Sequence, residues 1–249
     1  MCGVRRMSVE IVVDERYVER LRLRNDWVVV TGFPGFGYVG TIATRYITTQ
    51  LSAEKIGNII TKYMPDFIAL DDYGILTPYE LFMSYNHGLI VLVNNATPAS
   101  VERVAFAKAV VRWAKSLGVR EFILVGGLNS KFKEGSERLR WLKTSVSSRE
   151  LTEPKFHKGL YVVGPLAILF LTLEVEKVPT VMILPYTEPD KFDPKAAAVF
   201  IEKLNELLGL NISIQGLMEY SRIVEEAETL LSEALKNVKG EDRRPKPYI

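Results

Sequence analysis

The sequence predicts an α/β fold built on a mainly parallel central sheet that helices cover on both faces. Apolar runs rich in β-branched residues alternate along the chain with segments of helical periodicity. The runs are apolar at consecutive positions, which is typical of strands buried on both faces, as in parallel sheets. The expected strands are 27–32, 55–63, 88–95, 121–127 and 180–186.

The helices expected between these strands have recognisable beginnings and ends. The first is expected over roughly 38–52, directly after the first strand. The next is expected over 97–118, where Thr97 can cap the helix and Pro98 suits its first position. Gly118 can close this helix, because glycine adopts the left-handed conformation that often ends one.

Two further helices are expected near the end of the sequence. Asp193 and Pro194 provide a cap and a first position for one helix, and Gly209 ends it. The other is expected over about 214–238, with glutamates mostly on one side and apolar residues on the other. We expect the apolar stripe to pack onto the core or onto a neighbouring subunit. Its members are Leu217, Tyr220, Ile223, Val224, Ala227, Leu230, Leu231, Leu235 and Val238.

Charge and hydropathy exclude several classes of protein. The 249 residues carry 32 basic and 30 acidic side chains, so the net charge of +2 does not indicate a general nucleic-acid binder. Cys2 is the single cysteine, so no intramolecular disulfide is expected. The longest apolar run, 164–173, is too short to span a bilayer, and no apolar signal core is present. We expect a cytoplasmic protein with no membrane association, one α/β domain over 1–238 and a flexible tail over 239–249.

One polar segment interrupts the alternating pattern, at residues 128–160. Within 131–158 there are eight Lys or Arg residues and four Asp or Glu residues, and Trp141 is isolated among the charges. This composition could bind RNA, but aromatic side chains are sparse along it. A solvated flap or an edge hairpin is the favoured interpretation, and no nucleic-acid partner is expected.

Sequence motifs for catalysis are missing. The phosphate-binding P-loop, the G-x-S-x-G nucleophile elbow and the H-E-x-x-H zinc motif do not occur. The two histidines, His87 and His157, are 70 positions apart in polar contexts, where turn or surface roles are expected. No cluster of cysteine and histidine has the spacing of zinc ligands. We therefore expect no catalytic constellation and no metal.

Two groups of carboxylates could act as ligands. Asp71 and Asp72 are adjacent, and adjacent residues on a strand point to opposite faces, so a turn explains them equally well. Glu188, Asp190 and Asp193 follow a predicted strand, which is where parallel sheets bind ligands. The capping role of Asp193 and the neighbouring prolines make a structural turn a plausible alternative.

The strongest nucleotide signal is a glycine turn within 32–40. Gly35, Gly37 and Gly40 have the G-x-G-x-x-G spacing of a dinucleotide-binding turn, after a strand and before a helix. A dinucleotide fold also needs an acid at the end of the next strand, for the ribose. That strand, 55–63, is followed by a methionine and a proline instead. A structural turn is therefore favoured over a cofactor cradle, and no cofactor is expected.

Several segments together resemble one family, the proteasome assembly chaperones and their archaeal relatives. The segment 32–47, "GFPGFGYVGTIATRYI", resembles the strand, glycine turn and small-residue helix that open the family's fold. The segment 163–212 resembles its second half, which ends in an Ala-rich helix and "LLGL". The segment 214–231 is similar to its terminal helix, so the resemblance covers most of residues 25–235.

This resemblance implies a three-layer α/β sandwich similar to nucleoside phosphorylases and related hydrolases, without an established active site. It also implies homo- or hetero-oligomers that help to assemble proteasome α-rings. Some members carry a C-terminal motif of a hydrophobic residue, a tyrosine and any residue, which inserts between α-subunits of the core particle.

The sequence ends in Pro247, Tyr248 and Ile249, and Tyr248 matches the penultimate tyrosine of that motif. Pro247 departs from the usual aliphatic residue. We expect these three residues to bind the proteasome α-subunits, in a non-enzymatic protein that forms homo-oligomers. The alternative is a nucleotide-binding or hydrolase-type enzyme that uses the glycine turn at 32–40.

Overall fold

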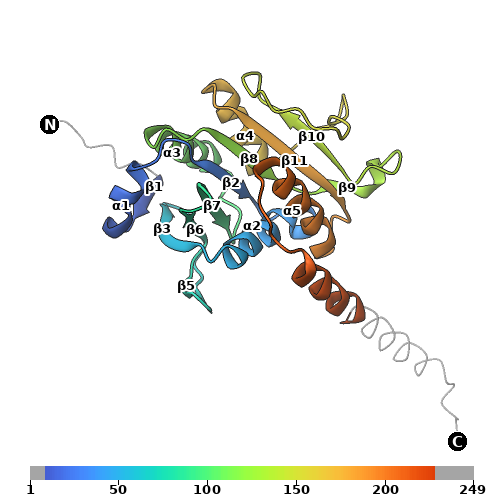
Figure 1. Cartoon of the computed structure of the whole chain (residues 1–249), viewed down its shortest axis with the longest axis horizontal. Helices are drawn as coiled ribbons and strands as arrows, with labels where there is room; N and C mark the ends of the chain where they lie inside the picture. Colours follow the sequence, from blue (N-terminus) through green and yellow to red (C-terminus); the bar gives the residue numbers. More distant parts are fainter. Residues whose placement is uncertain (1–8, 228–249) are drawn as a thin grey trace, which may run out of the picture.

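The computed structural model describes residues 9–227. A long β-sheet forms the centre of this part of the chain (Figure 1). Within that part it has nine strands, in the order β1-β3-β6-β7-β2-β8-β11-β10, and the short β9 pairs with β11. The strands are β1 Val9–Val13, β2 Val28–Gly32, β3 Glu54–Thr61, β6 Tyr79–Ser84, β7 Leu89–Asn94, β8 Glu121–Val125, β9 Leu128–Asn129, β10 Leu139–Lys143 and β11 Thr180–Thr187.

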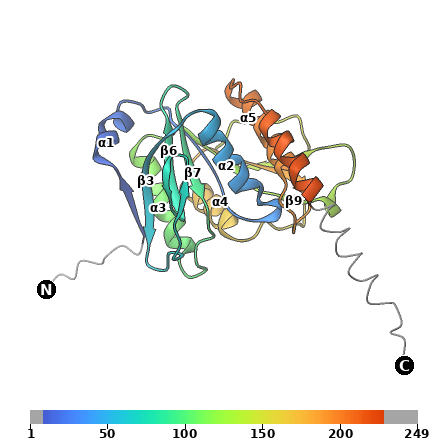
Figure 2. The same cartoon turned by 90° about the horizontal axis from the view of Figure 1, so that it is seen from below.

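Helices cover both faces of this sheet. One hydrophobic cluster lies under α3 and α4, and another lies under α2 and α5. Figure 2 shows α2 and α5 side by side. The fold therefore has three layers, with the sheet between two layers of helices. The helices are α1 Glu15–Arg22, η1 Phe36–Tyr38, α2 Val39–Gln50, α3 Arg103–Ser116, η2 Ser130–Phe132, α4 Pro165–Val175 and α5 Pro194–Leu208.

Two smaller features complete the fold. Strands β4, Ala69–Asp71, and β5, Gly74–Leu76, form a separate two-stranded hairpin. Residues 215–227 form a helix that extends away from the sheet in Figure 1. Of the helices in the described range, none has the length and apolarity that crossing a membrane would require.

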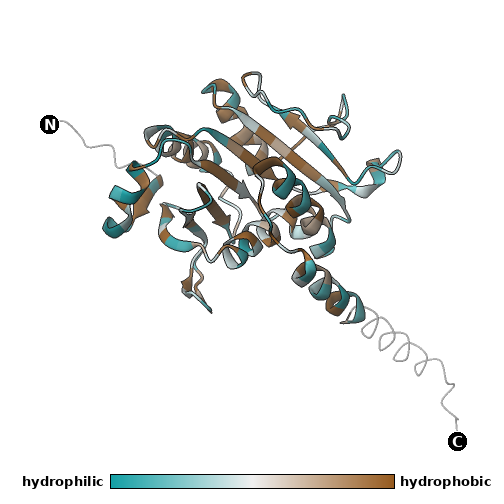
Figure 3. Cartoon of the chain, in the orientation of Figure 1, coloured by the Kyte–Doolittle hydropathy of each residue, from teal (hydrophilic) through white to brown (hydrophobic). Residues whose placement is uncertain are grey.

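The apolar runs form the centre of the sheet, as the sequence predicts. Every residue of β2, β6, β7 and β8 is buried. Side chains alternate between the two faces, so Val29 packs under α3 and α4 while Val28 and Val30 pack under α2 and α5. The colouring of Figure 3 shows β2 and β8 as predominantly hydrophobic. The core therefore consists of two apolar layers, one on each side of the sheet.

The expected mainly parallel sheet is wrong in one respect, because the sheet is mixed. Strands β7, β2, β8 and β11 are parallel, and β9 is parallel to β11. Strands β1, β3, β6 and β7 pair antiparallel at one side, and β10 pairs antiparallel with β11 at the other. The short turn 85–88 joins β6 to β7, and a connection of this length permits only antiparallel pairing. The strands expected from the sequence do not include β1, β4, β5 or β6, whereas β9 and β10 lie within 128–160, for which a solvated flap or an edge hairpin is the favoured interpretation.

The predicted helix ends were correct for α5, whereas for α3 the end at Gly118, with φ 68°, was correct and the start was wrong. Asp193 caps α5 by accepting a hydrogen bond from the amide of Ala196 at 2.9 Å, and Gly209 ends it at φ 66°. In contrast, α3 begins at Arg103 rather than at Thr97. The hydroxyl of Thr97 instead lies 3.5 Å from the carbonyl oxygen of Pro34, so this residue faces the glycine turn.

Trp141 is not isolated among charges, because β10 is an edge strand whose alternate side chains enter the core. Leu139 and Trp141 pack with α5, and the Trp141 indole donates to the carbonyl oxygen of Glu153 at 2.6 Å. Arg140 points to the other face, where it binds Glu134 and Glu137. A two-residue alternation of apolar and charged residues was the available signal.

Candidate functional site

A functional site could form at either end of the parallel strands, which we call the carboxyl edge and the amino edge. Their carboxyl ends lie beside the glycine turn, the pair Gly126-Gly127 and the loop 187–193. Ligands of open α/β sheets usually bind at this carboxyl edge. The amino ends of β2 and β8 lie beside a polar cleft. The candidate residues of the sequence are divided between these two edges.

Two glycines of the turn are required by packing. Gly37 has φ 64°, and a Cβ there would overlap the hydroxyl of Thr187. A Cβ on Gly40 would lie 2.7 Å from both the amide nitrogen and the carbonyl oxygen of Phe33. Because backbone atoms cannot move aside as a flexible side chain can, Gly40 lets the start of α2 pack directly onto the turn.

The amides of Gly37 and Tyr38 in the turn are bound within the protein. The amide of Gly37 donates to the carbonyl oxygen of Pro189 at 3.3 Å, and the amide of Asp193 donates to the carbonyl oxygen of Gly37 at 3.0 Å. The amide of Tyr38 donates back to the carbonyl oxygen of Gly35 at 2.9 Å. A phosphate cradle needs such amides free to point at the ligand. These contacts favour the structural interpretation of the turn.

The acids after β11 serve the same turn. Asp193 accepts a hydrogen bond from the Thr187 hydroxyl at 2.7 Å in addition to capping α5. Glu188 forms an ion pair with Lys191 at 3.2 Å. Among residues 9–227, no three side chains of His, Cys, Asp or Glu come together in a way that could hold a metal ion. The loop therefore joins β11 to α5 and anchors the glycine turn.

Asp71 and Asp72 lie at the tip of the β4–β5 hairpin. Asp71 forms an ion pair with Arg45 of α2, and it accepts a hydrogen bond from the backbone amide of Asp72 at 2.7 Å. The two aspartates therefore have different roles, since Asp71 contacts α2 and Asp72 contacts Asp71 through its amide. This contact fastens the hairpin to the body of the protein.

A buried polar network under that hairpin was missed from the sequence. Glu80 is fully buried, and it binds Lys55 at 2.5 Å, the Tyr73 hydroxyl at 2.7 Å and the Asn95 amide at 2.8 Å. Burial and the adjacent Glu80 raise the pKa of Tyr73. The carboxylate is fully engaged by neighbours, so the network holds strands together. Lys55 and Glu80 are too far apart in the sequence to have been paired by pattern.

The two histidines occupy opposite edges. His87 lines the polar cleft at the amino edge, and its Nδ1 lies 2.8 Å from the Ser84 hydroxyl. Ser84 is buried and does not line the cleft, which is unsuitable for a nucleophile. His157 Nε2 lies 3.1 Å from the carbonyl oxygen of Phe132, near the carboxyl edge. Each histidine therefore has a local partner, as expected for turn positions.

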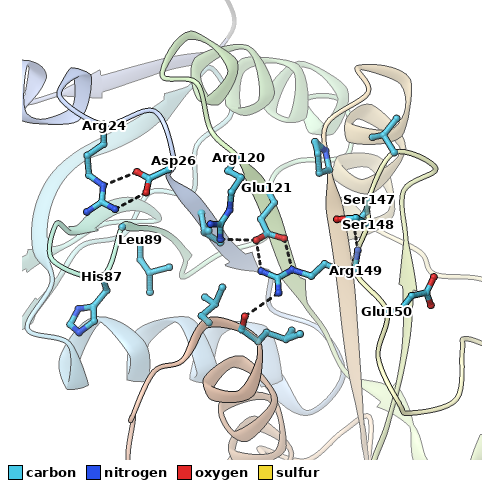
Figure 4. A pocket seen from close by; sticks show the side chains of 16 residues that line it. Arg24, Asp26, His87, Leu89, Arg120, Glu121, Ser147, Ser148, Arg149 and Glu150 are labelled. Atoms are coloured by element: carbon cyan, nitrogen blue, oxygen red, sulfur yellow. Dashed lines mark hydrogen bonds and ion pairs between the residues drawn. The ribbon is translucent and has the colours of Figure 1, made fainter.

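The polar cleft is the larger cavity, with a volume of about 790 Å³ (Figure 4). Arg24, Arg120 and Arg149 line it and would attract an anion if their charges were free. Arg24 instead binds Asp26 through two hydrogen bonds of 2.9 Å each. Arg120 and Arg149 both bind Glu121, as the dashed lines in Figure 4 mark.

Arg149 connects three parts of the fold. Its guanidinium makes hydrogen bonds of 2.6 and 2.9 Å to Glu121 at the start of β8, and another of 3.0 Å to the carbonyl oxygen of Leu207 in α5. Burial raises the pKa of Glu121, but the hydrogen bonds and charges of Arg149 and Arg120 outweigh it, and the net pKa is lowered. These hydrogen bonds of Arg149 to Glu121 and Leu207 cross the cleft, and we call them the charged clamp.

A smaller pocket lies at the carboxyl edge, with a volume of about 150 Å³. Apolar side chains and glycines form most of its lining, which comes from the glycine turn, the end of β8 and the start of α4. The lining residues are Phe33, Pro34, Gly35, Phe36, Gly126, Gly127, Leu128, Phe156, Tyr161, Val162, Val163, Pro165, Leu166 and Leu184. We call this the turn pocket.

The proposed docking residues lie outside the described part of the chain. Pro247, Tyr248 and Ile249 fall beyond residue 227, as does the boundary expected between 238 and 239. Of the terminal helix predicted over 214–238, residues 215–227 are described and helical.

Residues 9–227 thus define a three-layer α/β protein whose charged side chains bind mainly one another. A model of one protein family, the PAC2 family, matches residues 29–231. The chain belongs to the PAC2 family. The resemblance found in the sequence is confirmed by this match and by the structural relatives.

Two solved structures from Pyrococcus furiosus share the fold. PbaA, an archaeal homologue of proteasome-assembly chaperone, is 21% identical with a TM-score of 0.79, over 95% of this chain and 97% of that chain. PbaB, an archaeal proteasome activator, is 20% identical with a TM-score of 0.73, over 92% of this chain and 99% of that chain. An uncharacterised protein of Methanocaldococcus jannaschii is 19% identical over 88% of each chain.

Proposed function

We propose that this chain is a non-enzymatic, oligomeric protein that binds the α-ring of the proteasome core particle. The observation that carries this proposal is the PAC2 family match over residues 29–231, together with the fold shared with PbaA and PbaB. The engagement of the cleft arginines by carboxylates supports a binding role over catalysis. A nucleotide-binding function gains no support from the turn, whose Gly37 amide is already bound.

The proposed contact with the α-ring is made by Pro247, Tyr248 and Ile249. Tyrosine combines a large apolar ring with a polar hydroxyl, which suits a pocket between subunits. A linker of about ten residues spans up to roughly 30 Å, enough to reach a pocket away from the body. Several tails on one oligomer would bind with higher avidity than a single tail.

The proposed oligomer is supported by an apolar surface on α4. This helix is apolar except at Thr172 and Glu174, and Leu171 and Val175 are 57% and 68% exposed. On the neighbouring α3 and just before it, Val104 and Val101 are also exposed. A helix that is hydrophobic all round is normally buried. A second copy of the chain would cover this surface.

The experiment for the docking residues is native mass spectrometry with purified proteasome core particles. The full-length chain is compared with a form ending at Lys246 and with Tyr248→Ala and Tyr248→Phe. We expect the first two changes to weaken binding by at least about tenfold, and Tyr248→Phe to retain most of it because the ring remains. Equal binding by full-length and shortened chains would refute the role of these residues.

The oligomer is tested separately, by light scattering after size-exclusion chromatography. A double change, Leu171→Glu with Val175→Glu, should yield monomers because two charges would be buried at the interface. Lys177→Glu, just beyond the same helix, is the matched control and should leave the mass unchanged. A wild-type chain that is monomeric at all concentrations would refute this part of the proposal.

A further inference from the structure

Gly35 is the glycine of the turn that the protein itself does not require. Its φ is −165°, an extended conformation that any residue adopts. A Cβ there would have a single neighbour within 4 Å, the carbonyl oxygen of Phe33 at 3.8 Å. Gly37 and Gly40 differ, because backbone conformation or packing excludes a side chain at each. A glycine facing open space permits close approach of another molecule.

Gly35 lines the turn pocket, which has room for one apolar group. Its volume of about 150 Å³ resembles that of cavities known to hold a benzene molecule. The walls are shaped by close packing, since a Cβ on Gly126 would lie 2.6 Å from Cδ2 of Leu166. A single aromatic ring or branched aliphatic side chain would therefore fill the pocket.

Apolar side chains continue from the pocket onto the surface. Tyr161 and Val163 are 87% and 73% exposed, and Phe36 is also exposed. These three residues line the pocket and extend beyond it, so an incoming group would meet apolar surface around its entrance. Contiguous exposed apolar surface of this kind marks a site for a protein partner rather than for a small polar metabolite.

The segments beside the pocket carry more positive than negative charge. Lys131 and Lys133 flank Phe132, whose carbonyl oxygen contacts His157, and Lys158 follows that histidine. All three lysines are exposed, and none forms an ion pair within the described residues.

The nearby acids are already engaged. Glu134 and Glu137 both bind Arg140, and Glu134 also lies 3.7 Å from His157. Their two negative charges exceed the one positive charge of Arg140 by one, so two of the three lysine charges remain unmatched. The surroundings of the pocket therefore favour a partner with negative charge.

We propose that the turn pocket binds one aromatic or branched aliphatic side chain from an acidic segment of a partner protein. The side chain enters over Gly35, and carboxylates on either side of it face Lys131, Lys133 and Lys158. The apolar group provides the anchor, and the charges orient the segment. This binding is separate from the proposed contact of residues 247–249 with the α-ring, and it is tested without proteasomes.

The test uses short synthetic peptides and the full-length chain. Each peptide is acetylated, amidated and fluorescently labelled, with two acidic residues on each side of a central phenylalanine, leucine or alanine. Binding is measured by fluorescence anisotropy up to 5 mM protein sites or by calorimetry. We expect the phenylalanine and leucine peptides to bind at least about tenfold more tightly than the alanine peptide, because only they fill the pocket.

Variants of the chain locate the site. Gly35→Val places a side chain at the entrance without straining the backbone, and Gly126→Ala displaces Leu166 into the pocket. Each should weaken the phenylalanine peptide at least about tenfold, with thermal midpoints measured to show that both variants fold. Lys131→Glu with Lys133→Glu should weaken it about three- to tenfold and flatten its salt dependence. Lys108→Glu on α3 is the charge control and should have no effect.

Four results would overturn the proposal. The first is that the alanine and phenylalanine peptides bind equally, and the second is that a folded Gly35→Val chain binds as the wild type does. The third is that Lys108→Glu weakens binding as much as Lys131→Glu with Lys133→Glu. The fourth is that none of the three peptides binds measurably.

Discussion

The two edges of the parallel strands differ in how they use their side chains. The amino edge has the larger cavity and three arginines, yet each guanidinium there is bound to a carboxylate of the same edge. The carboxyl edge has a small, mainly apolar pocket, and exposed apolar groups continue from it onto the surface. Volume and charge are thus poor guides to binding where the charges are matched within the protein. The following predictions test this contrast, from the largest expected effect to the smallest.

Gly40→Ala should cause the largest loss of stability. The new Cβ would lie 2.7 Å from two backbone atoms of Phe33, so the turn and the start of α2 must separate. We expect the free energy of unfolding to fall by about 3 kcal/mol or more, measured by urea denaturation. Gly35→Ala is the matched control and should change it by less than about 0.5 kcal/mol. Equal losses in both variants would contradict the distinction between the two glycines.

Glu121→Gln should cause the next largest loss of stability, because it removes the carboxylate that binds Arg149. We expect a loss of about 1–3 kcal/mol in the free energy of unfolding, from the same denaturation experiment. Glu150→Gln also lies in the cleft, but its carboxylate is more than half exposed, so its loss should be below about 1 kcal/mol. If the two losses were equal, the amino edge would not be held by the charged clamp.

Asp193→Ala should have a smaller effect at the carboxyl edge. It removes the cap of α5 and the hydrogen bond to Thr187, which supports Gly37. We expect a loss of about 1 kcal/mol, from thermal or urea unfolding. Asp190→Ala, in the same loop and exposed, should be nearly neutral. A neutral Asp193→Ala would show that the loop is held by backbone contacts alone.

The smallest expected effect is on the acid dependence of stability. The folded-state pKa of Glu121 is lowered from its usual 4.5, so the unfolded chain binds this proton first as the pH falls. The stabilisation is therefore complete above about pH 4.5 and is lost as the pH falls through the folded-state pKa. The difference in stability between wild type and Glu121→Gln should shrink in that range and stay constant above it. A difference that grew in acid would reverse the assigned direction of the pKa.

Most strands that could be predicted from the sequence are almost uniformly buried, and β3 is the partly buried exception. Strands β2, β7, β8 and β11 lie at the centre, where both faces pack on helices, so their apolar runs stand out. Strand β6 was missed because Glu80 interrupts its apolar run, and this buried carboxylate is bound by Lys55 of β3 and by other polar neighbours. Strand β10 was expected only as part of a solvated flap or an edge hairpin, because its outward residues are charged.

The candidate site was predictable to a smaller extent. The glycine turn was found, and the absence of an acid after strand 55–63 led to its structural interpretation. The turn pocket could not be anticipated, because its walls come from segments more than a hundred residues apart. Sequence spacing also gave no indication that Arg149 binds Glu121.

The sequence by itself determined the alternation of strands and helices, the cap of α5 at Asp193 and the family resemblance. These features depend on local periodicity and backbone preferences, which are written in neighbouring residues. The tertiary structure alone decided that the sheet is mixed, that the cleft charges are paired and that Gly35 faces open space. Each of these depends on contacts between residues distant in the sequence, which no local pattern specifies.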